Sequence, residues 1–151
     1  MAADQGGHLY TASAVWSGDA MGCGTLKLPQ GDITLAIGGS KALGGCGLGA
    51  NPEELMLGAI AVCFVNTWAI FLKKLNVAYA EPAVRVSGAL IPDPAGGFKF
   101  QDATIYARVP ASLMAGQKAQ VEKTLTLAEK YCIISKVAKA AMPVSVVIEE
   151  V

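Results

Sequence analysis

The sequence contains very little arginine and histidine. Of its 12 basic residues ten are lysines, the only arginines are Arg85 and Arg108, and the one histidine is His8. Its four cysteines form no CxxC pair, and a single histidine is there to join them. Since structural metal sites gather several Cys and His ligands at short spacing, we expect neither a metal nor another cofactor.

The net charge is zero, because 12 acidic residues balance the 12 basic ones. The chain therefore has no basic field that would hold nucleic acid. The first residues lack a basic patch followed by an apolar run, so we expect no secretion signal and a cytoplasmic location. Cysteines there stay reduced unless they do redox work.

Hydrophobic residues, in contrast, make up 53% of the chain and charged residues only 16%. This is a high apolar content for a monomer, and it predicts a surface that either a partner chain or a membrane covers. The length of 151 residues is that of one ordinary domain, so we expect a single domain over residues 1–151.

The longest apolar run lies in 51–74, which has the ends of a helix. Asn51 is a good N-cap and Pro52 suits the first helical position. Residues 55–72 would measure about 27 Å as a helix, nearly enough to span a bilayer. Asn66 and Thr67 interrupt this run, and the rest of the chain supplies enough strand and helix to bury it. We therefore expect a core helix and no membrane span.

The remaining pattern predicts more strands than helices. Alternating apolar residues and turn signals indicate strands at 9–16, 22–28, 33–37, 83–91, 98–109 and 144–148. They also indicate a helix at about 115–131, and helical structure continues through 133–139 either directly or after a bend. The first three strands form an antiparallel meander and the next two a hairpin. Since strands and helices do not alternate, the fold class is α+β, with antiparallel sheets packed around the long buried central helix.

Two cysteines lie on the predicted helices. Cys63 is near the middle of the apolar helix, and Cys132 falls 69 residues later on the buried stripe of the second helix, so helix packing could bring their sulfurs together. Glu53, ten residues before Cys63, lies about 80° from it around the helix axis and too far along it for contact. Whether Cys63 is a packed structural thiol or a protected reactive one stays open on this pattern alone.

The other two cysteines are each flanked by glycines. Cys46 belongs to a run from 38 to 50 with six glycines, which has no GxGxxG spacing and so does not indicate a nucleotide site. Cys23 fits a small structural residue in its strand. Cys46 is either a small loop residue or an extra thiol that reaches the active site.

The segment NPEELMLGAIAVCF resembles the signature of the OsmC/Ohr family of thiol peroxidases. Asn51–Leu55 matches the segment that opens the family's central helix, and Ala61–Phe64 matches the segment with the reactive cysteine. The second family mark is a cysteine at the end of a later helix followed by Pro, a further residue and Ser. Here it is Cys132 with Ser135, and the proline is absent.

This resemblance implies an intertwined α+β homodimer that reduces organic hydroperoxides. Cys63 would become a sulfenic acid, Cys132 would resolve it as a disulfide, and a dithiol such as a lipoyl group would be the reductant. An apolar pocket of Met56, Phe64 and Trp68 would receive the peroxide.

The chain departs from the family pattern in one respect. Family members have an arginine beside the reactive cysteine, and the glutamate that matches Glu53 holds it there. Neither the stretch around Leu43 nor residues 17–21 supplies one here. Lys41 is the nearest substitute, although an ammonium is a point charge and not a planar fork. The alternative is a protein with the OsmC fold that lacks fast peroxidase activity, and that binds a small apolar ligand or does other thiol chemistry.

Overall fold

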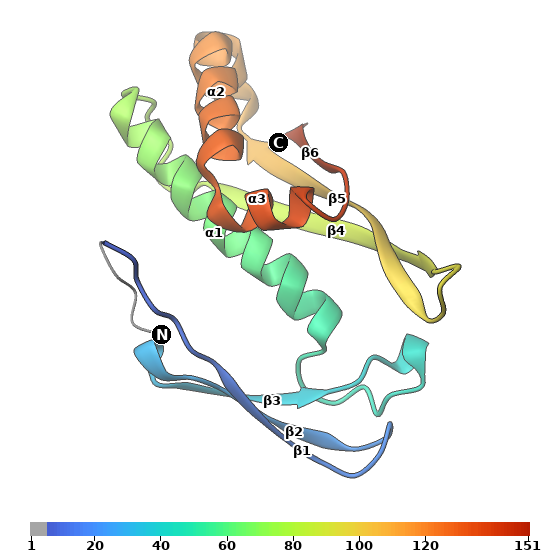
Figure 1. Ribbon diagram of the computed structural model, residues 1–151. Coiled ribbons are helices and arrows are strands. Elements are labelled where there is room, and N and C mark those ends of the chain that lie inside the picture. The colour runs from blue at the N-terminus through green and yellow to red at the C-terminus, as the bar shows by residue number, and fades with distance from the viewer. Residues whose placement is uncertain (1–5) are drawn as a thin grey trace. The chain divides into compact units, whose positions relative to one another are not determined.

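The computed structural model describes residues 6–151. The chain forms two compact units, of which one extends to Leu55 and the other runs from Met56 to Val151. The helix α1 (Pro52–Lys74) begins in the last residues of the first unit and continues through the second (Figure 1). The single domain over 1–151 remains a prediction, since each unit is compact by itself.

The first unit is the predicted antiparallel meander. Its strands are β1 (Ser13–Ser17), β2 (Cys23–Leu28) and β3 (Ile33–Gly38), hydrogen-bonded in that order. Short 3₁₀ turns follow β2 and β3, at Pro29–Gly31 (η1) and Lys41–Leu43 (η2). The prediction that the first strand begins at residue 9 is wrong. Pairing of β1 with β2 starts at Ser13 opposite Lys27, close to the end of β2, so the preceding residues have no strand opposite them.

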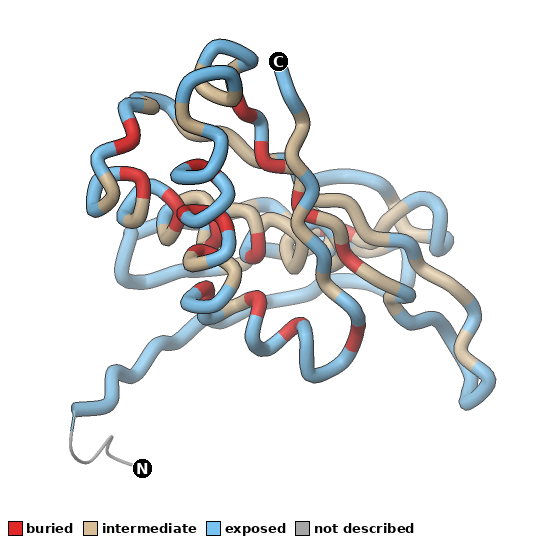
Figure 2. The backbone as a smooth tube through the Cα atoms, turned by 90° about the horizontal axis from the view of Figure 1, so that it is seen from above, coloured by how far each residue is buried: buried red, intermediate tan, exposed pale blue. Residues whose placement is uncertain are grey.

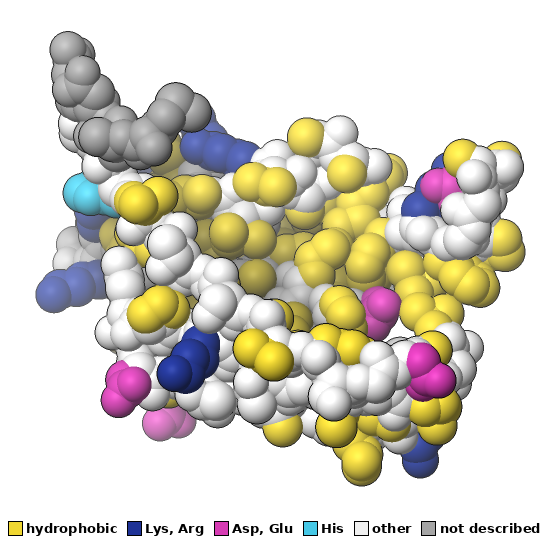
Figure 3. Space-filling view, turned by 60° about the horizontal axis from the view of Figure 1, so that its bottom comes forward, with side chains coloured by type: hydrophobic (Ala, Val, Ile, Leu, Met, Phe, Trp, Pro, Cys, Tyr) yellow, Lys and Arg dark blue, Asp and Glu magenta, His cyan; other side chains and the backbone are white. Residues whose placement is uncertain are grey.

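The first unit has almost no core of its own. Among residues 6–55 only Gly38 is buried (Figure 2). Large apolar side chains are exposed instead, among them Leu9, Val15, Met21 and Leu48 at 62–71%. Hydrophobic side chains accordingly occupy much of the molecular face drawn in Figure 3. A three-stranded sheet of this kind needs further apolar cover to be stable.

Both predicted ends of α1 are confirmed. Oδ1 of Asn51 accepts a hydrogen bond from the N–H of Glu54 at 2.8 Å, which satisfies one free donor of the first turn. At the other end Asn76 has a positive φ of 54°, and the N–H of Val77 donates to the carbonyl of Leu72 at 2.9 Å. This arrangement is a Schellman motif, which closes the helix after its two C-terminal lysines.

The second unit contains a sheet in the order β4 (Ala83–Pro92), β5 (Phe98–Val109) and β6 (Val144–Glu150). The predicted hairpin of β4 and β5 is confirmed. The predicted α+β class is confirmed, and the sheet of the second unit is mixed, because β6 pairs in parallel with β5. Parallel neighbours need a long crossover, which α2 (Ala111–Tyr131) and α3 (Ile133–Lys139) supply between the two strands.

The core of the second unit lies between one face of this sheet and the helices. It joins alternate residues of β5 to a stripe on α1 at four-residue spacing and to the inner face of α2 (Ala103, Ile105, Ala107 and Val109; Ile60, Phe64, Trp68 and Leu72; Val121, Leu125 and Ala128). Helix α1 is long and apolar enough to cross a membrane, and this stripe makes it a core helix. Its other faces keep apolar side chains exposed, such as Val62 at 69%.

Of the two predicted paths through Cys132, the structure has the one with a bend. α2 begins at Ala111, four residues earlier than expected, because the carbonyl of Pro110 accepts the N–H of Met114 and closes a first turn. It is kinked at Gln117, where φ is −138°. It ends at Cys132, whose φ of −64° and ψ of 111° are extended, and α3 starts at the next residue.

Candidate active site

The structure brings Cys63 and Cys132 together within the second unit. Cys63 lies in the middle of α1, is partly exposed and packs against the core. Cys132 lies at the break between α2 and α3 and is fully buried, as its place on the buried stripe predicted. The thiol of Cys63 is close enough to Cys132 to influence its ionisation. Both cysteines are free thiols in this structure.

Three effects act on the Cys132 thiol. Burial raises its pKa, since a thiolate loses hydration there. Ser135 works against this rise through its hydroxyl, which donates to the sulfur at 3.0 Å, and through its backbone N–H. The adjacent Cys63 raises the pKa further. Because burial dominates, Cys132 is a neutral thiol at physiological pH.

Ser135 is the partner that sequence reasoning underestimated. Its side chain is fully buried, one turn into the segment that begins at Cys132, and the N–H of Lys136 donates to the Cys132 carbonyl. A serine three residues after a cysteine at a helix start can reach the sulfur. That spacing was the available signal, but sequence reasoning used Ser135 only as part of the family mark.

Hydrogen bonds fix the helix behind Cys63. Thr67 Oγ1 donates to the carbonyl of Cys63 at 2.8 Å, one turn along α1. Trp68 Nε1 donates to Oγ1 of Thr124 at 2.9 Å, and this hydroxyl donates in turn to the carbonyl of Val121 at 2.6 Å. The chain of bonds joins α1 to α2 inside the core, so it holds the cysteine-bearing helix at a defined position.

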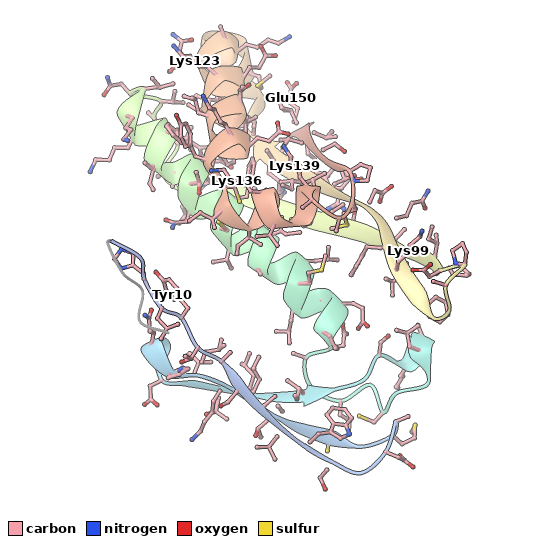
Figure 4. The ribbon with its side chains drawn as sticks, viewed as in Figure 1. Tyr10, Lys99, Lys123, Lys136, Lys139 and Glu150 are labelled. Carbon is pink, nitrogen blue, oxygen red and sulfur yellow. The ribbon has the colours of Figure 1, made fainter. Side chains whose placement is uncertain are left out.

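An apolar cavity of about 290 Å³ opens on the same unit. Its lining comes from the first turns of α1, the start of β5, and α3 with the turn that follows it (Met56, Ile60, Lys99, Phe100, Ile134, Val137, Ala138, Ala141 and Met142). Met56 lines this cavity, whereas Phe64 and Trp68 are fully buried in the core and do not line it. Lys99 is the single charged residue of the lining, near the start of β5 (Figure 4). Sequence reasoning missed the α3 residues, because it treated that segment only as a helix.

The groups expected to supply a cation are not brought together. Oε2 of Glu53 is buried and has no hydrogen-bond partner among the described residues. The exposed Lys41 runs its side chain along Gly47, and within residues 6–151 no ion pair joins it to Glu53. The two arginines lie on the sheet of the second unit, where Arg85 and Arg108 both approach Glu149, at 3.3 and 3.8 Å.

Comparison with known proteins gives consistent matches. The family model described as OsmC-like protein matches residues 44–147. Organic hydroperoxide resistance protein-like 1 of Staphylococcus epidermidis is 30% identical over 105 residues, which cover 70% of this chain and 73% of that protein. The uncharacterised protein YmaD of Bacillus subtilis is 27% identical over 131 residues and 85% of each chain.

Solved structures share the fold. A putative organic hydroperoxide resistance protein from Vibrio cholerae, with captopril bound in one of its active sites, has a TM-score of 0.73 and 25% identity, and the match covers 95% of each chain. The residues that carry the sequence signature, Asn51–Leu55 and Ala61–Phe64, lie within the matched part of the family model. The chain therefore belongs to the OsmC family.

Proposed function

We propose that this protein is a thiol peroxidase that reduces organic hydroperoxides. The Cys63 thiolate attacks the peroxide ROOH, the O–O bond breaks, and ROH leaves with a proton, which gives a sulfenic acid on Cys63. The Cys132 thiol then displaces water from that sulfur and forms a Cys63–Cys132 disulfide. An external dithiol, such as a lipoyl group, returns both cysteines to thiols and becomes a disulfide itself.

The observation that supports this proposal best is the asymmetry of the two cysteines. Cys63 is partly exposed on a helix held by core hydrogen bonds, and Cys132 is a fully buried thiol beside it. A buried neutral thiol is a poor first nucleophile, since the thiolate is the reactive form. Next to a sulfenic acid, however, it condenses readily to a disulfide. The arrangement therefore suits Cys63 for attack and Cys132 for resolution.

The apolar cavity supports an organic substrate over hydrogen peroxide. Its lining is apolar apart from Lys99 and includes Met56 and Ile60, which lie on α1 upstream of Cys63. Burial of an alkyl or aromatic group there gains about 25 cal/mol per Å² of apolar surface, a gain that hydrogen peroxide cannot make. We assign Glu53 to the positioning of a cation, with Lys41 as the candidate, because a buried carboxylate oxygen without a partner favours a nearby positive charge.

The protein acts as a homodimer in this proposal. The first unit has one buried residue among those described and many exposed apolar side chains, so a second copy of the chain is the natural cover. The reduced state of the resolving pair requires a reducing compartment, which agrees with the cytoplasm.

Stopped-flow oxidation by cumene hydroperoxide tests the peroxidase. We expect the wild type to consume one equivalent far faster than free cysteine does, and Cys63→Ser to lose this reaction. Cys23→Ser is the matched control, since Cys23 belongs to the other unit. Wild-type protein that reacts no faster than free cysteine would refute the proposal. Mass spectrometry of the product should find the Cys63–Cys132 bridge, and a stable sulfenic acid with a free Cys132 would remove the resolving role.

A second function is favoured by two observations, the apolar cavity and the engagement of both arginines with Glu149. In this alternative the protein binds a small apolar ligand, or does other thiol chemistry, and has no fast peroxidase activity. Calorimetric binding of cumyl alcohol distinguishes the two when it is combined with the kinetics. Tight binding without fast oxidation supports the alternative, and fast oxidation excludes it.

A further inference from the structure

Two further cysteines, Cys23 and Cys46, both lie next to Gly38 in the first unit. Cys23 on β2 is directly opposite Gly38 on β3 in the antiparallel register. A Cβ built on Gly38 would lie 2.8 Å from Sγ of Cys46. Because opposite residues of an antiparallel pair have Cβ positions about 5 Å apart on the same face, the Cβ of Cys23 and the sulfur of Cys46 are at most about 8 Å apart.

The glycine at position 38 is what makes this approach possible. A side chain there would collide with the carbonyl oxygen of Leu48, at 2.1 Å, as well as with the sulfur of Cys46. The glycine-rich loop therefore lies directly over Gly38, on the face of the sheet that also carries the Cys23 side chain. The sulfur of Cys46 occupies space that a side chain at position 38 would have filled.

Hydrogen bonds on either side of Cys46 keep the loop in place. The N–H of Gly45 donates to the carbonyl of Ser40 at 2.8 Å, and the N–H of Gly47 donates to the carbonyl of Gly39 at 2.9 Å. The amide of Leu48 also donates to the sulfur of Cys46 at 3.4 Å. Cys46 is thus held against the sheet. Gly47, with its φ of 70°, leaves the loop some freedom to adjust.

We propose that Cys23 and Cys46 form a second redox-active dithiol, which a low-molecular-weight disulfide oxidises to an intramolecular bridge. Cys23 is exposed and Cys46 is partly buried, so the incoming disulfide RSSR meets Cys23 first. The Cys23 thiolate attacks one sulfur, breaks the S–S bond and releases RS⁻, which leaves a mixed disulfide on Cys23. The Cys46 thiolate then attacks the Cys23 sulfur and releases the second RS⁻.

The exchange is balanced, because two electrons pass from the protein dithiol to RSSR and the two thiol protons go to the two RS⁻ groups. It requires neither Cys63 nor a peroxide, so it goes beyond the proposed peroxidase. The bridge would tie β2 to the glycine-rich loop that ends at Ala50, just before the Asn51 cap of α1. Oxidation would therefore lock the segment that leads into the cysteine-bearing helix.

The test uses a Cys63→Ser, Cys132→Ser variant, in which Cys23 and Cys46 are the only thiols. After equilibration with oxidised and reduced glutathione, we expect the loss of both thiols in a monomeric chain on a non-reducing gel. Trypsin cuts after Lys27 and Lys41, so the bridge should join peptide 1–27 to peptide 42–73. Mixed glutathione disulfides on both cysteines, or bridges only between chains, would overturn the proposal.

A matched control moves the thiol along the same face of β2. The pair Cys23→Ser, Thr25→Cys places a cysteine opposite Ala36, two residues away from the Gly38 position. Since each strand residue adds about 3.3 Å, we expect at least about tenfold less intramolecular bridge at the same glutathione ratio. Equal bridging by this control would show that flexibility, and not the Gly38 geometry, brings the thiols together.

The same question can be asked of the protein with all four cysteines, in case the double variant does not fold. Cleavage after Glu53 and Glu54 by a glutamate-specific protease separates Cys46 from Cys63. After digestion with this protease and trypsin together, glutathione-oxidised wild type should yield peptide 1–27 joined to a peptide that contains Cys46 and ends at Glu53 or Glu54. A bridge from Cys23 to the Cys63 peptide, or no bridge, would refute the pairing, whether or not the protein reduces peroxides.

Discussion

The hydroxyl of Ser135 should control how readily Cys132 resolves the sulfenic acid of the proposed reaction. Ser135→Ala removes the hydrogen bond that donates to the Cys132 sulfur at 3.0 Å and works against the rise of its pKa. The substitution takes away one buried oxygen and adds no bulk. The pKa of Cys132 should therefore rise further.

The size of the effect follows from the charge on the acceptor. A hydrogen bond to a charged group contributes about 1.5–3 kcal/mol, and a change of one pKa unit corresponds to 1.36 kcal/mol. Loss of this bond should raise the pKa of Cys132 further, because the thiolate loses a donor. Disulfide formation at neutral pH should then slow by about three- to tenfold, since a smaller thiolate fraction is partly offset by the greater nucleophilicity of a more basic thiolate.

The assay is single-turnover disulfide formation from neutral to alkaline pH, followed by acid quench and mass spectrometry. Formation of the Cys63 sulfenic acid should keep its rate, while conversion to the Cys63–Cys132 disulfide should shift to higher pH. Thr124→Ala is the control, because it also removes a buried hydroxyl but one that bonds Trp68 and Val121. Overlapping pH profiles for Ser135→Ala and wild type would refute the reasoning, as would an equal shift in Thr124→Ala.

Three further predictions concern stability. The free energy of unfolding should fall as pH rises above about 8.5, because unfolded Cys132 ionises there while burial keeps the folded thiol protonated. In urea titrations, Cys132→Ala should reduce this dependence on pH by up to about 1.4 kcal/mol per pH unit. An unchanged slope contradicts it. Gly58→Ala should raise stability by about 0.5–1 kcal/mol, because a Cβ there meets no atom within 4 Å in the helix. Thermal unfolding at a lower temperature would oppose this. Trp68→Phe should lower the free energy of unfolding by about 1–3 kcal/mol, since it leaves the buried Thr124 hydroxyl without its donor and opens space in the core. Unchanged thermal unfolding would contradict this.

Elements with local signals were predictable from the sequence. The ends of α1 follow from Asn51, Pro52 and the terminal lysines, which act within one or two turns. The hairpin of β4 and β5 follows from two alternating strands around a turn rich in proline and glycine. Errors arose where a boundary depends on a distant partner. The first strand starts at Ser13 because pairing with β2 extends no further.

The candidate site was predictable only in part, for the same reason. The motif identified Cys63 and Cys132, and the structure brings them together. Phe64 and Trp68 share the apolar helix with Met56, but periodicity cannot tell which side of an apolar helix meets the core. Packing against β5 and α2 buries the first two, whereas Met56 remains on a cavity wall.

The sequence by itself determined the fold class and the family and pointed to two candidate site cysteines, because capping residues, apolar periodicity and a short motif act over neighbouring residues. Tertiary structure alone decided the parallel pairing of β6, the contact of Ser135 with Cys132 at a helix break, and the approach of Cys46 to Cys23 over Gly38. These features depend on residues far apart in the chain, or on a local backbone geometry that long-range packing selects. Their energies come from burial and hydrogen bonds that exist only after the chain has folded.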